Sequence, residues 1–208
     1  MKDLKNLKCL LPKTKELLLE LIETCDFLEK YIFVGGSALA LHICHRKSED
    51  LYFFTFEDSF DKKEIFEYIK RFENKEILNQ TDEQIDLLIN GVKVTFFNAK
   101  WSFLKPVKVS KFNLAALESI AAMKVNVLFL RAKFRDYYDL YFLAKEKMSI
   151  KEIFKASEHI VEGITFKLFA VALVYIDDIE DDDISHLQPK ERLSKEKIRE
   201  FFQKRLKS

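Results

Sequence analysis

Two adjacent glycines, Gly35 and Gly36, constrain this chain more than any other feature, because they separate a β-rich run from a helix-forming one. The run 31–34 precedes them, and the run 38–44 follows Ser37, which is a good helix N-cap. This order predicts a strand, a tight turn and a helix. Ordinary turn chemistry explains such a pair, but the first N–H groups of the helix would also form a cradle suited to a phosphate.

A second β-rich run, 51–54, follows a polar turn at 46–49, and Asp50 stands at its start. The carboxylate of Asp50 would hold a cation close to the phosphate cradle. Arg46 and His45 lie at the turn, where a cationic side chain would contact the same phosphate.

Composition sets broad limits on the fold and on the partners. The chain has 208 residues, of which 48% are hydrophobic and 33% charged, which suits one ordinary domain or a catalytic core with a helical extension. The net charge of +1 gives no overall indication of nucleic acid or of an anionic membrane. The most apolar late segment, 168–176, is shorter than the ~20 residues that span a bilayer, so we expect no membrane partner.

The three cysteines, Cys9, Cys25 and Cys44, are an odd number without metal-site spacing. The first eight residues, Met-Lys-Asp-Leu-Lys-Asn-Leu-Lys, lack the uninterrupted apolar core of a secretory leader. These features predict reduced thiols in a cytoplasmic protein.

Strand patterns and helix patterns occupy different halves of the chain. In the first half, Asn90-Gly91 between two β-rich runs predicts a hairpin, and Asp61 starts a helix with a capping-box-like pattern. From residue 113 onward the pattern is helical. We therefore predict an α+β fold, with an α/β core at 1–112 and a helical subdomain at 113–208. The expected strands are 31–34, 51–54, 77–78, 85–89, 92–97 and 107–109; the expected helices are 10–30, 38–44, 61–72, 114–130, 136–146, 149–159, 165–175 and 194–206.

Two motifs connect these halves to a known family. Residues 35–42 read Gly-Gly-Ser-Ala-Leu-Ala-Leu-His, and residues 45–54 read His-Arg-Lys-Ser-Glu-Asp-Leu-Tyr-Phe-Phe. In the second half, Lys124 lies in a helix of small residues, and Arg-Asp-Tyr-Tyr-Asp-Leu follows at 135–140. Over roughly residues 30–145 the chain resembles the AbiEii/AbiGii toxin family of nucleotidyltransferases, within the DNA polymerase β-like nucleotidyltransferase superfamily.

The resemblance implies a mixed nucleotidyltransferase-like sheet with flanking helices. It also implies transfer of a nucleotide from an NTP to an acceptor such as a tRNA 3′ end, with Mg²⁺ or Mn²⁺, by the toxin of a toxin–antitoxin or abortive-infection pair that includes a cognate antitoxin. By this resemblance Asp50 is a catalytic metal ligand, and Lys124 and Asp136 complete the catalytic set. The nucleotide-binding residues would be Gly35, Gly36, Ser37, Arg46 and Lys124.

The residues of the second half support part of this assignment independently. Lys124 shares an apolar helical stripe with Ile120 and Leu128, so its ammonium must find a counter-charge, either a triphosphate or Asp136. Without the resemblance, spacing of four among Arg131, Arg135 and Asp139 fits an intrahelical ion-pair ladder. With it, we assign Arg135 and Asp139 to the scaffold.

Two positions depart from the family pattern and leave an alternative open. Tyr52 stands where the second aspartate of an Asp-x-Asp pair belongs, and Thr95 stands on the strand where a third acid is expected. Alternation places Tyr52 on the same face as Asp50, and a phenol is a poor Mg²⁺ ligand. In the alternative interpretation, these two replacements have removed the metal site, and the chain is a catalytically degenerate nucleotide-binding or interaction module. Substitute acids near the site are Glu49, Glu57, Asp58 and Asp86.

The last third carries two blocks of charge. We expect the acidic run 177–183 to be a solvated loop. Residues 184–208 hold eight Lys and Arg against three Glu, a local net charge of +5. The apolar face of the last helix would dock on the rest of the protein, and an RNA-contacting edge is the weaker alternative.

Overall fold

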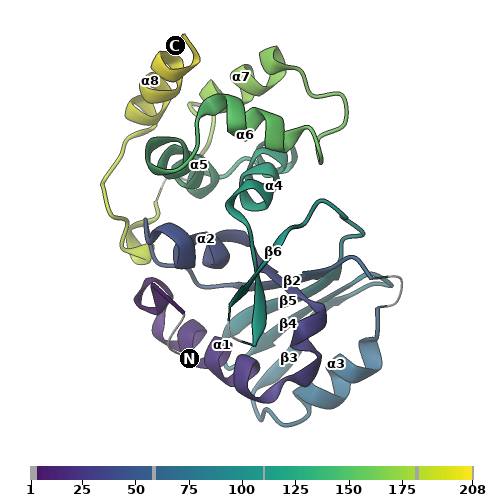
Figure 1. Ribbon diagram of the computed structural model, residues 1–208. Coiled ribbons are helices and arrows are strands. Elements are labelled where there is room, and N and C mark those ends of the chain that lie inside the picture. Colours follow the sequence, from purple (N-terminus) through teal and green to yellow (C-terminus); the bar gives the residue numbers. More distant parts are fainter. Residues whose placement is uncertain (1–3, 58–59, 110, 181–182, 208) are drawn as a thin grey trace. The chain divides into compact units, whose positions relative to one another are not determined.

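The protein is described here from a computed structural model, which covers residues 4–57, 60–109, 111–180 and 183–207. The chain divides into two compact units, Met1–Ala116 and Leu117–Ser208 (Figure 1). Strands occur in the described part of the first unit, whereas the described part of the second is helical. The α+β prediction is confirmed.

Unit 1 is built on a mixed sheet with strand order β3-β4-β5-β2-β1-β7-β6. β1 pairs with β7 and β2 with β5 in parallel, and the other neighbours are antiparallel. The strands are β1 (Ile32–Val34), β2 (Leu51–Thr55), β3 (Lys75–Gln80), β4 (Gln84–Ile89), β5 (Val92–Asn98), β6 (Pro106–Val109) and β7 (Phe112–Ala115).

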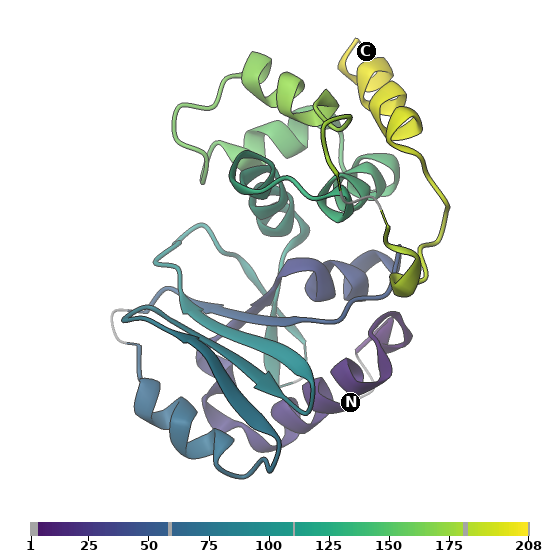
Figure 2. The same ribbon diagram turned by 180° about the vertical axis from the view of Figure 1, so that it is seen from behind.

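Helices cover one face of this sheet. α1 (Pro12–Thr24) and α3 (Lys62–Ile69) lie on the same side of it in both views (Figures 1 and 2). The short 3-10 helix η2 (Asp26–Lys30) lies on this face too, since the Phe27 ring is 5.9 Å from that of Phe96 on β5. The remaining helices of the unit are η1 (Leu7–Cys9) and α2 (Gly35–Ile43).

The two faces of the sheet differ because successive side chains of a strand alternate. Phe53 and Phe96 are buried and stack at 5.4 Å on the helix-covered face. Their neighbours in the sequence, Phe54 and Phe97, are only half-buried and lie on the opposite face. That second face also carries Tyr52, Thr95 and Asp86, which are successive partners across β2, β5 and β4.

Local sequence patterns predicted several features correctly. The stripe of α1 is buried as expected, and the Asp61 carboxylate accepts hydrogen bonds from the N–H groups of Lys63 and Glu64 at the start of α3. Asn90 and Gly91 both have positive φ, 51° and 81°, as a tight hairpin turn requires.

The predicted helix at 114–130 begins too early. Residues 112–115 form β7, which pairs in parallel with β1 and antiparallel with β6, and helix α4 spans Leu117–Leu130. Ala115 and Leu114 have good helix propensity, but pairing with strands distant in the sequence overrides it.

Unit 2 contains α4, α5 (Phe134–Glu146), α6 (Ile150–Ser157), α7 (Phe166–Val174), η3 (Ser185–Leu187) and α8 (Lys195–Leu206). The apolar face of α8 is docked, because Ile198 and Phe202 are fully buried and Phe201 lies 4.5 Å from the ring of Tyr141 on α5. In the acidic run, Asp177 pairs with Arg199; Asp181 and Asp182 lie outside the described residues. Among the described helices, none has the length and apolarity to cross a membrane.

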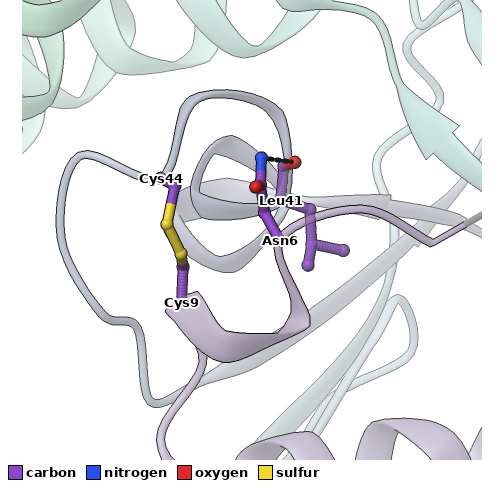
Figure 3. The surroundings of a disulfide bond; sticks show 4 residues. All are labelled: Asn6, Cys9, Leu41 and Cys44. Atoms are coloured by element: carbon purple, nitrogen blue, oxygen red, sulfur yellow. Dashed lines mark hydrogen bonds between the residues drawn. A yellow bond between two sulfur atoms is a disulfide. The ribbon is translucent and has the colours of Figure 1, made fainter.

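The prediction of three reduced thiols is wrong for two of the cysteines. Cys9 and Cys44 form a disulfide, with their Cα atoms 5.5 Å apart (Figure 3). The amide of Asn6 also donates to Leu41 O at 2.9 Å, so η1 is fastened to the end of α2. Folding brings the two cysteines together over 35 positions, which spacing in the sequence does not reveal. Cys25 is a buried free thiol whose pKa is raised to about 12, chiefly by burial.

Candidate functional site

The first turn of α2 follows directly from β1 because Gly35 makes the bend. Gly35 has φ of +78°, and a Cβ there would lie 3.0 Å from the Tyr52 ring. The N-cap is Val34, and among the described residues no side chain caps the helix. The prediction that Ser37 is the N-cap is therefore wrong: Ser37 is the third residue of the helix, and its hydroxyl donates to the backbone carbonyl of Asp50.

This hydrogen bond holds the start of α2 against the residue that precedes β2. Ser37 is fully buried and so takes part through this contact, while the N–H groups of the first turn form the positive end of the helix dipole. The predicted cradle residues and Asp50 are thus neighbours in unit 1.

Arg46 adds a positive charge at the same place. A Cβ on Gly36 would lie 2.9 Å from the Arg46 guanidinium and 3.3 Å from the Ser48 hydroxyl, so only glycine fits without displacing them. Arg46 is 4% exposed and donates from Nη1 to Lys47 O at 2.9 Å. A guanidinium beside a helix N-terminus favours an anion.

Tyr52 lies on the same face as Asp50, as strand alternation predicts. Its hydroxyl donates to Asp50 Oδ2 at 3.3 Å, and both side chains are half-buried. A phenol therefore occupies the place beside Asp50 that a second carboxylate would need.

An acid, Asp86, does lie next to Thr95, on the neighbouring strand β4. Tyr52, Thr95 and Asp86 are successive partners across β2, β5 and β4, so they share one face. Asp86 accepts hydrogen bonds from Thr95 Oγ1 at 2.5 Å and from Gln84 Nε2 at 2.9 Å. Asp86 is 7% exposed.

Asp86 therefore fits the substitute role better than the other acids. Glu49 and Glu57 both lie outside the row of paired strand positions that contains Tyr52, Thr95 and Asp86. Asp58 lies outside the described residues. Within the described residues no three His, Cys, Asp or Glu side chains gather as a cation cage. Asp50 supplies one carboxylate. This suits a single Mg²⁺ that takes its other oxygens from a bound triphosphate, which is a common way for proteins to bind this ion.

In unit 2, Lys124 finds the counter-charge that its apolar stripe demands. Its Nζ lies 2.9 Å from Asp136 Oδ1 and 2.6 Å from Asp139 Oδ2. The side chain of Lys124 is 8% exposed, and both carboxylates are fully buried. We call these three residues the lysine cluster.

Arg131, the first residue of the ion-pair ladder that spacing suggested, contacts Asp136 of the lysine cluster. Arg131 Nη2 lies 3.6 Å from Asp136 Oδ1, and Asp136 Oδ2 accepts from the N–H of Lys133 at 3.3 Å. Asp139 also contacts Lys124 directly. Asp136 and Asp139 lie three apart on one helical face, so both reach the same ammonium.

The two histidines near α2 and a hollow of unit 1 complete the description of this unit. His42 is hydrogen-bonded to Ala115 O at 2.8 Å, and His45 is fully buried. A hollow of about 550 Å³ contains none of the predicted site residues; Lys13, Glu16, Leu17, Glu20, Asn74, Asn90 and Gly91 line it.

Comparison with solved structures defines the class of the fold. JHP933 from Helicobacter pylori has a TM-score of 0.57 at 18% identity, over 94% of this chain and 89% of that chain. MenT4, a nucleotidyltransferase toxin of Mycobacterium tuberculosis H37Rv, has a TM-score of 0.57 at 15% identity, over 92% and 84%. The fold is that of the nucleotidyltransferases.

Sequence comparison then gives the family. Residues 101–207 match the family described as Nucleotidyl transferase AbiEii toxin, Type IV TA system, and the chain belongs to this family. The uncharacterized protein aq_aa25 of Aquifex aeolicus (strain VF5) is 29% identical over 202 residues, which cover 95% of this chain and 96% of that protein. The resemblance stated from the motifs is confirmed.

Proposed function

We propose that the protein transfers a nucleotide from an NTP to the 3′ end of an RNA acceptor such as tRNA. What supports this proposal is that, within unit 1, the Arg46 guanidinium lies beside Gly36 in the first turn of α2, and Ser37 of the same turn donates to the backbone carbonyl of Asp50.

In this proposal the phosphates bind at the start of α2. The N–H groups of Gly35, Gly36 and Ser37, together with Arg46, take the triphosphate oxygens. Asp50 holds Mg²⁺ or Mn²⁺, which neutralises charge on the phosphates when it is bound. The acceptor hydroxyl oxygen attacks the α-phosphorus, the bond from that phosphorus to the bridging oxygen breaks, pyrophosphate leaves, and the hydroxyl proton passes to solvent.

Lys124 and Asp136 have a paired role in this proposal. The Lys124 ammonium lies 2.9 Å from Asp136 Oδ1 and 2.6 Å from Asp139 Oδ2, and its remaining N–H donor is the one that we assign to nucleotide binding. Asp136 fixes the direction of the ammonium and so acts as a positioning residue.

A second function is favoured by Tyr52 and Thr95. Because the Tyr52 hydroxyl donates to Asp50 and Thr95 occupies the third-acid position, the site has fewer carboxylates than a two-cation mechanism uses. Under this alternative the protein binds an NTP and transfers nothing.

A label-transfer assay separates the two functions. The purified protein is incubated with each α-labelled NTP, Mg²⁺ or Mn²⁺, and total tRNA. We expect label on tRNA that Asp50→Ala abolishes and that Glu67→Ala, a matched change at an exposed position of α3, leaves intact. NTP binding without transfer, with transfer gained in Tyr52→Asp, would establish the second function instead.

The partner and the compartment follow from the same proposal. A toxin of a type IV system implies an antitoxin, and we propose that one counteracts this protein in the cell. NTPs and tRNA are cytoplasmic, so we place the protein there. A free-thiol titration of protein extracted under acid quench then shows whether Cys9 and Cys44 are paired in that reducing compartment.

A further inference from the structure

Four aromatic rings form a connected group on the half-buried face of the unit 1 sheet. Phe54 on β2 and Phe97 on β5 are 5.0 Å apart, and Trp101 lies 5.8 Å from Phe54 and 6.3 Å from Phe97. Phe103 follows at 5.7 Å from Trp101. All four side chains are half-buried. We call this group the aromatic platform.

The platform shares its face with Asp50. Asp50, Tyr52 and Phe54 are spaced two residues apart, so alternation puts them on one side of the sheet. Thr95 and Phe97 are the β5 partners of Tyr52 and Phe54, so they lie on the same side. Because a strand rises about 3.3 Å per residue, the platform begins about 7 Å beyond the row of Tyr52 and Thr95.

Core packing alone does not account for these rings. The apolar core of the sheet lies on the opposite face, where Phe53 and Phe96 are fully or almost fully buried. Half-buried rings gathered beside a polar site are the kind of surface on which nucleobases stack, and such stacking tolerates any base because each has a π face.

The charge pattern around the platform favours a polynucleotide over a mononucleotide. Lys100 and Lys105 bracket the two loop rings in the segment Lys-Trp-Ser-Phe-Leu-Lys, and both lysines are exposed. Lys100 pairs with Glu83 at 2.5 Å, an exposed contact of the kind that contributes little, so a phosphate can replace it. Basic residues interleaved with aromatic ones are the common pattern of single-strand binding surfaces.

We propose that the aromatic platform stacks the unpaired terminal bases of the single-stranded RNA acceptor. This inference rests on the proposed function, because it places the acceptor strand on the face that carries Asp50. The donor triphosphate remains at the first turn of α2, and the acceptor end approaches from the ends of β2 and β5.

Trp101 is the only tryptophan of the chain, so its fluorescence reports directly on the platform. The full-length protein is titrated with a single-stranded oligoribonucleotide, with a blunt duplex of the same sequence, and with an NTP. We expect saturable quenching by the single strand and none by the duplex. Equal quenching by the duplex, or quenching by the NTP alone, would overturn the proposal, the second result by assigning the platform to the donor base.

Substitutions then test the rings one at a time. Phe103→Leu and Phe97→Leu should each weaken single-strand binding about 5- to 150-fold. Phe129→Leu, which changes an exposed phenylalanine (43%) of unit 2, is the control and should bind as wild type does. Trp101→Phe keeps a ring, so its affinity for fluorescein-labelled RNA, read by anisotropy, should stay within about threefold. Unchanged affinity in Phe103→Leu, with an unchanged far-UV spectrum, would refute the platform.

The platform proposal and the nucleotide-transfer proposal can fail separately. Loss of single-strand binding in the platform variants of a protein that transfers no label would retain the platform and reject transfer. Transfer to RNA with an unchanged KM for RNA in Phe103→Leu would retain transfer and reject the platform.

Discussion

The Asp50 face of unit 1 and the lysine cluster of unit 2 use carboxylates in opposite ways. On the Asp50 face, neutral hydroxyls of Tyr52 and Thr95 donate to Asp50 and Asp86. In the lysine cluster, a nearly buried ammonium contacts two fully buried carboxylates. The first arrangement leaves negative charge for an incoming cation, whereas in the second the ammonium, with Arg131 3.6 Å from Asp136, offsets the two carboxylates and ties α4 to α5. We infer that the first region serves ligand binding, and that the second stabilises unit 2 while it fixes the direction of the Lys124 ammonium.

The largest expected effect is on the lysine cluster. Lys124→Met leaves Asp136 and Asp139 buried without their cation, and breaking such a buried pair costs about 3–5 kcal/mol. Urea unfolding measures the loss. Lys155→Met, on the exposed side of α6, is the control and should change stability by less than ~0.5 kcal/mol. A wild-type unfolding midpoint in Lys124→Met would remove the distinction drawn between the two regions.

Removal of the disulfide of unit 1 should have the next largest effect on the free energy of unfolding. Cys44→Ser should lower the free energy of unfolding by about 2–4 kcal/mol under oxidising conditions, because the Cys9–Cys44 bond closes a long loop. With reductant present, wild type and variant should unfold at the same denaturant concentration. A difference of the same size in both conditions would mean that packing at Cys44, and not the bond, stabilises this region.

A smaller loss of stability is expected when the charge of Glu152 is removed at the start of α6, away from the lysine cluster. The Ser149 N–H donates to Glu152, which lowers the pKa of that carboxyl. A lowered folded-state pKa stabilises the protein above the unfolded-state value, near 4.5, and this contribution is lost as pH falls through the folded-state pKa. Glu152→Gln should therefore lower the Tm slightly at pH 7 and leave it unchanged at pH 3. An equal Tm difference at both values would reject the charge-based explanation.

The smallest expected effect on stability is at the Asp50 face. Asp50→Asn keeps the shape of a half-buried side chain and should change the free energy of unfolding by less than ~0.5 kcal/mol. Thermal unfolding of the ligand-free protein checks this. A loss comparable to that of Lys124→Met would show that Asp50 is structural.

Local chemistry allowed much of this structure to be predicted. The hairpin at Asn90-Gly91, the Asp61 cap and the buried stripe of α1 each depend on residues close in the sequence. The order of motifs gave the family. The face shared by Asp50 and Tyr52 followed from alternation alone.

Long-range pairing decided what could not be predicted. β7 exists because it pairs with β1, and Asp86 meets Thr95 because of the register between β4 and β5. The Cys9–Cys44 bond depends on the packing of η1 at the end of α2. The prediction of Ser37 as N-cap is wrong because the bend at Gly35 moves the helix start three residues earlier.

Calorimetric titration of Mg²⁺–NTP into wild type and Asp50→Asn tests the central claim most directly. If Asp50 and the first turn of α2 hold the metal–triphosphate together, Asp50→Asn should weaken Mg²⁺-dependent binding at least ~10-fold, and the two proteins should bind alike in EDTA. Equal affinity of the two proteins for Mg²⁺–NTP would contradict the claim.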